Sequence, residues 1–349
     1  SLVMEDAFVI FLARLPFPML EIQPEPPPAN YVWGPYHDEK LRLIAETGMR
    51  LIATVGDALQ WAADKRCAPV YTNRMDDFAQ FLTDLVSRYQ APPYQIKHWE
   101  LINEPDGTGS GLGDTGLGCW ADESTDQDGA RYAEMLAMAS DAIKAADPEA
   151  TVLMGGMAYD WFTEYGGPFD RYFPDDVMKA GGAEHVDVLN LHYFPDWRRE
   201  WERWDPRSRD RRLGWLKTPT CGDTFDGNGE TFEAMGLDLA IKSSYFRHRM
   251  RTCFGVQKPL WVTELAEHGY ADDPTSLTRQ AGYVIRGYAR GLAAGVENIT
   301  WYALTAPNDG FEQDLLFDDW TPKPGYVAYQ TMAAELDEYV YSHDRSASS

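Results

Sequence analysis

Short apolar runs alternate with amphipathic patterns along this chain. Each run is nearly continuous in apolar character, which is typical of parallel strands covered on both faces. Six runs occupy residues 50–55, 98–103, 151–155, 186–193, 260–264 and 298–304, and a seventh strand is expected within residues 8–22. Between the runs, apolar residues spaced three and four apart predict helices around residues 41–45, 78–89, 132–143 and 281–292. The alternation indicates an α/β fold built on a parallel sheet.

The spacing of the strands favours a (β/α)8 TIM barrel over a doubly wound sheet. Strands recur every 35–70 residues or so, and no glycine-rich phosphate loop follows any of them. A complete barrel needs an eighth strand and a helix before Phe8, and one βα unit takes about thirty residues. Only seven residues precede Phe8. We therefore expect one catalytic (β/α)8-type domain over residues 1–349 that is incomplete or rearranged at its N-terminus, with no visible first βα unit.

A long insertion interrupts the pattern at about residues 195–231. Residues 198–212 contain seven arginines and four acidic residues, together with Trp201 and Trp204, and Trp197 lies at their border. An insertion after the C-terminal end of a strand would overhang the active-site face of a barrel. A solvated surface loop is equally compatible with this composition.

Composition and charge narrow the classes of partner. The 349 residues carry 31 Lys and Arg against 55 Asp and Glu, a formal net charge of −24. This charge argues against nucleic acid as the main partner. The longest apolar stretch near the start has seven residues, too short to cross a bilayer, and no signal peptide is visible in the chain as given. We expect no membrane partner, and the compartment stays open.

The four cysteines predict no metal centre. Cys67, Cys119, Cys221 and Cys253 are widely spaced, with no CxxC pair and no histidine at ligand spacing. Isolated thiols are the favoured interpretation, and pairing of two of them stays open. We expect no metal and no organic cofactor.

Two glutamates stand at the ends of predicted strands. Glu104 follows the run WELIN and precedes Pro105, and Glu264 closes the run LWVTE. Barrel closure would bring both carboxylates to one rim. Cleavage of an acetal requires one protonated and one ionised carboxyl group that face each other. A short distance between them predicts retention of configuration at the anomeric carbon, and a longer distance predicts inversion. Alternatively, each glutamate only forms an ion pair at a strand end.

These segments resemble a known family. WELINEPD and PLWVTELAEHG look like the two catalytic strands of the clan A retaining glycoside hydrolases, and the likeness is strongest to families 39 and 5. The resemblance continues through DVLNLHYF, GVENITWYAL and DDWTPKPGYVAYQTM and covers most of residues 31–332. It implies a β-glycosidase acting on an oligosaccharide or a small glycoside.

The resemblance also implies roles for single residues. Glu104 would be the general acid/base and Glu264 the nucleophile. Asn103 would form a hydrogen bond to the sugar 2-hydroxyl, Tyr193 would hold the nucleophile carboxylate, and Trp301 would form the floor of the sugar subsite. His192 either touches substrate or is a packed core histidine, and Arg14 matches a second-strand arginine that steadies the nucleophile.

The positions of four further residues relative to the predicted strands indicate possible roles for them. Trp61 and Trp120 follow strands, so each is either a platform on which a sugar stacks or a core side chain. By strand alternation, Glu267 and His268 fall beyond the strand that carries Glu264 and are expected at the rim.

The leading hypothesis is a retaining O-glycosidase that works by double displacement. A second hypothesis is a sugar-binding protein that has lost activity, because an absent first βα unit would open the barrel and loosen the site. A third is a homo-oligomer in which a partner chain supplies the packing that the N-terminus lacks.

Overall fold

The computed structural model describes residues 12–17, 19–28, 30–56, 61–65, 67–109, 118–121, 128–163, 167–195, 221, 239–305 and 312–336. The chain divides into two compact units. The N-terminal unit contains residues 11–191 and 254–259, and the C-terminal unit contains the described residues of 192–253 and those from 260 onward. Most of the predicted insertion, with Trp197, Trp201 and Trp204, lies outside the described residues.

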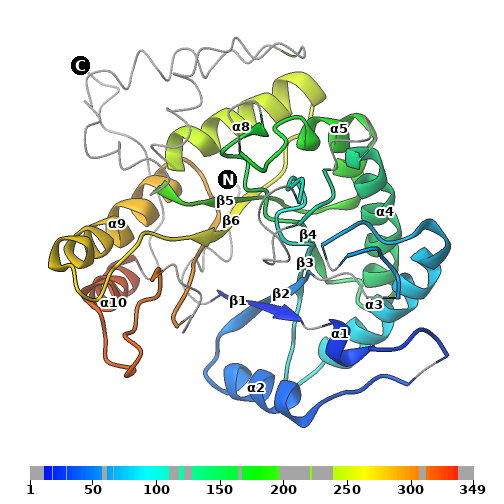
Figure 1. The fold of residues 1–349 in the computed structure, drawn as a ribbon, viewed down its shortest axis with the longest axis horizontal. Helices are drawn as coiled ribbons and strands as arrows, with labels where there is room; N and C mark the ends of the chain where they lie inside the picture. Colours follow the sequence, from blue (N-terminus) through cyan, green and yellow to red (C-terminus); the bar gives the residue numbers. More distant parts are fainter. Residues whose placement is uncertain are drawn as a thin grey trace, which may run out of the picture. The chain divides into compact units, whose positions relative to one another are not determined.

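The N-terminal unit is built on a four-stranded sheet in the order β1-β2-β3-β4 (Figure 1). The strands are β1 Leu12–Phe17, β2 Arg50–Val55, β3 His98–Leu101 and β4 Thr151–Met154, and each neighbouring pair is parallel. Bridges from Leu153 to Val188 and from Met157 to Leu191 extend the parallel pairing to the start of β5. The helices of this unit are α1 Met19–Ile22, α2 Pro35–Glu46, α3 Met75–Tyr89, α4 Asp128–Ala146 and α5 Phe173–Lys179, with the 3-10 turns Thr72–Arg74 and Gly182–His185.

The C-terminal unit contains a three-stranded sheet in the order β5-β6-β7. These strands are β5 Leu189–Tyr193, β6 Leu260–Leu265 and β7 Asn298–Trp301. Its helices are α8 Leu239–Phe254, α9 Pro274–Ala293 and α10 Pro324–Leu336, of which α9 and α10 pack against each other (Figure 1). No helix in the described part of the chain is long and apolar enough to span a bilayer.

The strand order confirms an α/β fold with parallel sheets. All seven predicted strands are present. Within each sheet, neighbours in space are also neighbours in sequence, which is the order of a barrel rather than of a doubly wound sheet with its central reversal. The four predicted helices correspond to α2, α3, α4 and α9. Closure of the barrel and an incomplete N-terminus remain predictions.

The core of the N-terminal unit follows the predicted pattern. Residues 51–55 of β2 are buried throughout, and all four residues of β3 except the first are buried. Helix α3 turns one apolar face inward through Phe78, Phe81, Leu82, Leu85, Val86 and Tyr89. Burial of side chains of this size stabilises the fold by roughly 1.5–3 kcal/mol each.

A histidine at the start of β3 makes the stability of this unit depend on pH. Burial, with a smaller contribution from the charge of Arg50, lowers the pKa of His98 from 6.5 to about 4. The unfolded chain therefore binds a proton more readily than the folded chain between these values, so stability falls as the pH falls from 6.5 towards 4. Between about pH 7.5 and about pH 4.5 this single group should lower the free energy of unfolding by about 2.5 kcal/mol.

Urea unfolding of the unmodified protein and of His98→Gln, at both pH values, measures this contribution. The loss of stability on acidification should be smaller in the variant by that amount. Equal losses in the two proteins would mean that His98 titrates alike in the folded and unfolded chains.

Candidate active site

The chain leaves β3 in an abrupt turn that carries Asn103 and Glu104. Ile102 and Glu104 adopt left-handed backbone conformations with φ of 69° and 44°, each at a cost on the order of 1–2 kcal/mol. The Glu104 amide donates to the Gly156 carbonyl at 3.1 Å, and the Glu104 carbonyl accepts from the Gly107 amide at 2.9 Å. Strain held in place by such contacts is typical of functional sites. Glu104 is 4 % exposed.

The side chain of Asn103 is held from β1. Arg14 Nη2 donates to Asn103 Oδ1 at 2.5 Å. The same guanidinium binds the carboxylate of Glu100, on β3, through Nε and Nη2 at 2.8 Å each. Arg14 thus contacts Glu100 and Asn103 within this unit, and its expected role of steadying the nucleophile remains a prediction.

A disulfide ties a second segment to the turn at Glu104. Cys67 and Cys119 are bonded, and the Cys119 amide donates to the Cys67 carbonyl at 3.1 Å. Beside Cys119, Gly118 packs so closely that an added Cβ would lie 2.4 Å from the Glu104 carbonyl oxygen. The preference for isolated thiols was therefore wrong, since Cys221 and Cys253 are also bonded. Cross-links between residues so far apart in sequence are not visible in the spacing of the cysteines, because folding alone brings them together.

A buried aspartate joins the loop after β3 to the loop after β4. Asp106 is 0 % exposed, and its carboxylate accepts the amides of Ala158 at 3.1 Å and Tyr159 at 2.7 Å. Tyr132, on α4, makes a similar link, because its hydroxyl donates to the Leu101 carbonyl and accepts from the Gly155 amide. Burial raises the pKa of Tyr132, so its hydroxyl keeps its proton and remains a donor.

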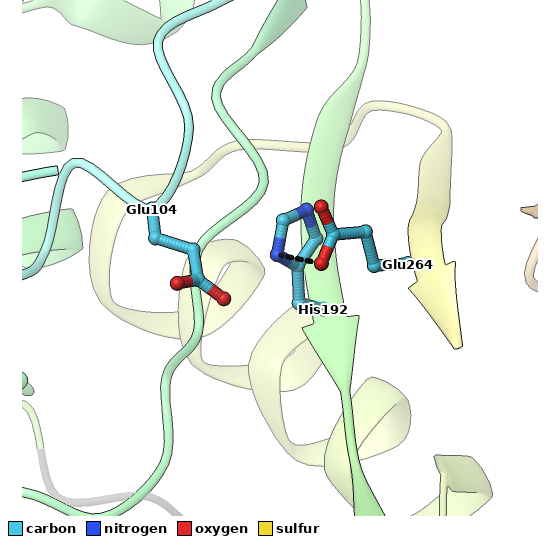
Figure 2. Close-up of side chains that lie close together, drawn as sticks. All are labelled: Glu104, His192 and Glu264. Carbon is cyan, nitrogen blue, oxygen red and sulfur yellow. Dashed lines mark ion pairs between the residues drawn. The ribbon is translucent and has the colours of Figure 1, made fainter. Parts of the chain in front are cut away.

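In the C-terminal unit, Glu264 lies near the end of β6. The register of β6 against β7 shifts between Val262 and Leu265, and such an irregularity changes the direction of the side chains within it. The Glu264 carboxylate lies 3.4 Å from His192 Nδ1, and His192 Nε2 lies 3.3 Å from Thr263 Oγ1. Figure 2 shows the glutamate beside the imidazole and also labels Glu104, which belongs to the other unit.

The two ring nitrogens of His192 face different partners, Nδ1 the Glu264 carboxylate and Nε2 the Thr263 hydroxyl. If Thr263 Oγ1 donates to Nε2, the proton of the ring is on Nδ1 and points at Glu264. A hydrogen bond donated to a carboxylate stabilises its ionised form. His192 is 0 % exposed and lies beside the Glu264 carboxylate, so it is packed in the core, and its contact with substrate remains a prediction.

A buried lysine on α8 contacts β5, the strand that carries His192. Lys242 is 0 % exposed, and its ammonium donates to the His192 carbonyl at 2.9 Å. The ammonium also lies over the ring of Tyr193, 5.6 Å from its centroid. Tyr193 is 1 % exposed. Its expected bond to the nucleophile remains a prediction.

The predicted tryptophans differ in their surroundings. Trp301 ends β7 and is buried, and its indole donates to the Gln313 carbonyl at 3.1 Å. Trp61 follows β2 and is half-buried, its indole donating to the Gln23 carbonyl while Arg74 lies over its ring. Trp120 is 1 % exposed and its ring packs edge-on against Tyr132, which favours core packing over a sugar platform.

Two residues were expected beyond the strand that carries Glu264. Glu267 lies beyond the end of β6, as expected, where it is 0 % exposed and pairs with Arg279 at 3.3 Å; its place at the rim of a barrel remains a prediction. His268 is half-buried and stacks on Tyr270 at 5.3 Å between ring centroids.

Sequence reasoning missed Glu100, Asp106 and Lys242 as members of these networks. Each is a charged residue with little or no exposure, and a buried charge costs free energy unless it is paired and hydrogen-bonded. For two of them, the position in the sequence could have indicated a role. Glu100 and Asp106 flank the Asn-Glu-Pro segment, and Glu100 lies inside an otherwise apolar run. Lys242 gave no signal, because it is one of several basic residues in α8.

Solved structures of similar fold are glycoside hydrolases. A family 39 glycoside hydrolase from Bacteroides cellulosilyticus WH2 superposes with a TM-score of 0.64 at 18 % identity, covering 95 % of this chain and 60 % of that one. A family 39 β-xylosidase from Caulobacter crescentus gives 0.58 at 16 % identity, with 93 % and 64 % covered. A variant enzyme of subfamily GH5_18 from Streptomyces cattleya gives 0.60 at 14 % identity, with 96 % and 74 % covered.

These similarities establish the fold, and the sequence establishes the family. The chain spans less than two thirds of the length of the first solved structures that it matches. No curated protein matches it. The family described as cellulase, glycosyl hydrolase family 5, matches residues 14–286, which include Asn103, Glu104, His192 and Glu264. This chain belongs to glycosyl hydrolase family 5, a family of retaining β-glycosidases in clan A.

Proposed function

We propose that this protein hydrolyses β-linked O-glycosides with retention of configuration, with Glu264 as nucleophile and Glu104 as acid/base. The observation that carries the proposal is the setting of each glutamate within a chain of family 5. Glu104 stands in a strained turn after β3, and Glu264 stands near the end of β6 beside the imidazole of His192. The proposal includes the expectation from the sequence that the strands close into a (β/α)8-type barrel with both carboxylates at its rim.

The first step would form a covalent glycosyl-enzyme. The Glu264 carboxylate attacks the anomeric carbon while the bond from that carbon to the leaving oxygen breaks, and Glu104 gives its proton to that oxygen. The Nδ1 proton of His192 favours the ionised carboxylate that this attack requires. Glu104, held 4 % exposed, is in a setting that favours the uncharged acid before the first step.

The second step would release the sugar. Glu104, now a carboxylate, takes a proton from water, and the oxygen of that water attacks the anomeric carbon and displaces Glu264. Asn103 would bond the sugar 2-hydroxyl, an interaction that strengthens as positive charge develops at the anomeric carbon. Both glutamates return to their starting protonation states, so the cycle needs no other reactant than water.

The other predicted residues would shape the sugar subsite. Trp301 would form its floor, because its indole N–H is anchored to the Gln313 carbonyl and an indole ring can stack on the apolar face of a sugar. Tyr193 would hold the Glu264 carboxylate from β5. Trp61 would contribute at the edge, with Arg74 already over its ring.

Trapping of the covalent intermediate tests this proposal. Suitable reagents are dinitrophenyl 2-fluoro-β-glycosides of mannose, glucose, xylose and galactose. The fluorine slows both steps, and the activated leaving group restores the rate of the first, so hydrolysis of the glycosyl-enzyme becomes rate-limiting and the intermediate accumulates. Mass spectrometry should find one fluorosugar per chain, on the peptide that contains Glu264. The sugar that labels fastest identifies the specificity.

Two other results would redirect the assignment. Label on a different carboxylate would contradict the role of Glu264. Sugar binding in calorimetry, with neither labelling nor hydrolysis of any glycoside in the panel, would favour a sugar-binding protein that has lost activity.

A further inference from the structure

One buried carboxylate of the N-terminal unit has no part in the mechanism above. Glu100 lies on β3, four residues before Glu104, and is 0 % exposed. Its carboxylate accepts two bonds from Arg14 at 2.8 Å, one from the Gly156 amide at 3.1 Å and one from the Thr54 hydroxyl at 3.4 Å. These four contacts come from β1, β2 and the loop after β4.

Stability alone is a weak explanation for this arrangement. Removing two charges from water costs several kcal/mol per ion, and well-packed apolar residues of similar volume often stabilise a fold as well or better. The buried Glu100 carboxylate is therefore better explained by the groups that its partners hold in place than by its attraction to Arg14.

The partners of Glu100 lead to both residues of the Asn103-Glu104 pair. Arg14, fixed by two bonds to Glu100, donates to Asn103 Oδ1 at 2.5 Å. Gly156 donates its amide to Glu100, and its carbonyl accepts the Glu104 amide at 3.1 Å. One carboxylate thus sets the side chain of Asn103 through Arg14 and the strained backbone of Glu104 through Gly156.

We propose that Glu100 is a positioning residue that aims Glu104 and orients the amide of Asn103. This proposal rests on the proposed function, because it assigns Glu100 a role in that reaction. Arg14 occupies Asn103 Oδ1, so Asn103 presents its NH2 group to the sugar and acts as a donor to the 2-hydroxyl oxygen. The turn that carries Glu104 is strained, and its contact with Gly156 depends on the amide that Glu100 holds.

Glu100→Gln tests this role with little change in volume. In one orientation the new NH2 group would face Arg14 Nη2 and the Gly156 amide, and in the other it would face Arg14 Nε and the Thr54 hydroxyl. In both orientations an N–H of Arg14 loses its acceptor, because an NH2 group cannot accept a hydrogen bond. An unactivated β-glycoside needs a well-aimed proton for its leaving group, whereas a dinitrophenyl glycoside does not. We expect kcat/KM to fall about 100-fold for the first substrate and no more than about 5-fold for the second. The ratio of the two values should therefore change by at least about 20-fold.

Asp147→Asn is the matched control. Asp147 is 2 % exposed, accepts from Lys97 at 2.7 Å and lies in the same unit near the opposite end of β3. This variant removes an equally buried, cation-paired carboxylate, so it should lower the thermal midpoint and leave the substrate ratio of the unmodified enzyme unchanged.

Each outcome decides one question. An active Glu100→Gln enzyme that keeps full activity on both substrates overturns the positioning role. Equal losses on both substrates overturn the aiming of Glu104, because a misoriented Asn103 would affect both substrates alike. If that variant does not fold, Arg14→Lys replaces it, because a single ammonium cannot bind Glu100 twice and also reach Asn103; the same two outcomes decide the same two questions there. Absence of hydrolysis by the unmodified protein overturns the proposed function itself.

Discussion

Glu264→Ala is expected to lower kcat/KM for aryl β-glycosides by a factor on the order of 10⁵. The loss follows because the variant has no nucleophile that can form the glycosyl-enzyme, while binding of the sugar and proton donation by Glu104 remain. The alanine also leaves space near the imidazole of His192, 3.4 Å from the carboxylate that it replaces. Azide can enter that space and attack the anomeric carbon from the face that Glu264 attacks.

Restoration of turnover by azide measures this role directly. The product should be a glycosyl azide of α configuration, the opposite of the substrate, because a single displacement replaces two. Glu297→Ala is a suitable control, since Glu297 is a partly exposed carboxylate just before β7, at the other end of the strands of the same unit. It should keep its activity and show no response to azide. Activity of Glu264→Ala near that of the unmodified enzyme, without azide, would contradict the assignment.

Glu104→Ala is expected to have effects that depend on the leaving group. For an unactivated glycoside kcat/KM should fall about 10³- to 10⁴-fold, because the first step loses its proton donor. For a dinitrophenyl glycoside the first step needs little help, so kcat/KM should fall far less. Its kcat should still decrease, because water attacks the glycosyl-enzyme without a base.

The pH profile of the variant gives a second measurement. The decrease in kcat/KM on the alkaline side reports loss of the proton from the acid, so it should disappear in Glu104→Ala. Glu149→Ala serves as the control, because Glu149 is a largely exposed carboxylate of the same unit in the turn before β4. Equal losses for both classes of substrate would show that Glu104 is not the acid.

The local pattern of apolar residues predicted which strands and helices exist better than it predicted the residues at which they begin and end. The apolar run at 98–103 predicted a strand, and β3 ends at Leu101 because Ile102 turns into the left-handed region. Helix α9 begins at Pro274, capped by Asp273, which accepts from the Thr275 amide. That start lies before the apolar spacing from which the helix was predicted, because capping and helix-start residues carry no apolar period.

Besides α1, which has four residues, three helices of the described part of the chain were not predicted, and their sequences show why. Helix α8 buries Lys242 and Arg249 on its inner face, so the face that should read as apolar contains charges. Helix α5 has seven residues, too few for a period to stand out. Helix α10 contains small and apolar residues around its circumference, of which only Gly325 and Met332 are buried.

The sequence by itself determined the parallel α/β fold, the seven strands and the two strand-end glutamates, because each of these is a local pattern of residue types. The tertiary structure alone decided which polar groups meet: His192 with Glu264, Arg14 with Glu100 and Asn103, and Cys67 with Cys119. Such pairs join residues far apart in the chain, and their energies depend on distance and burial that no local pattern encodes.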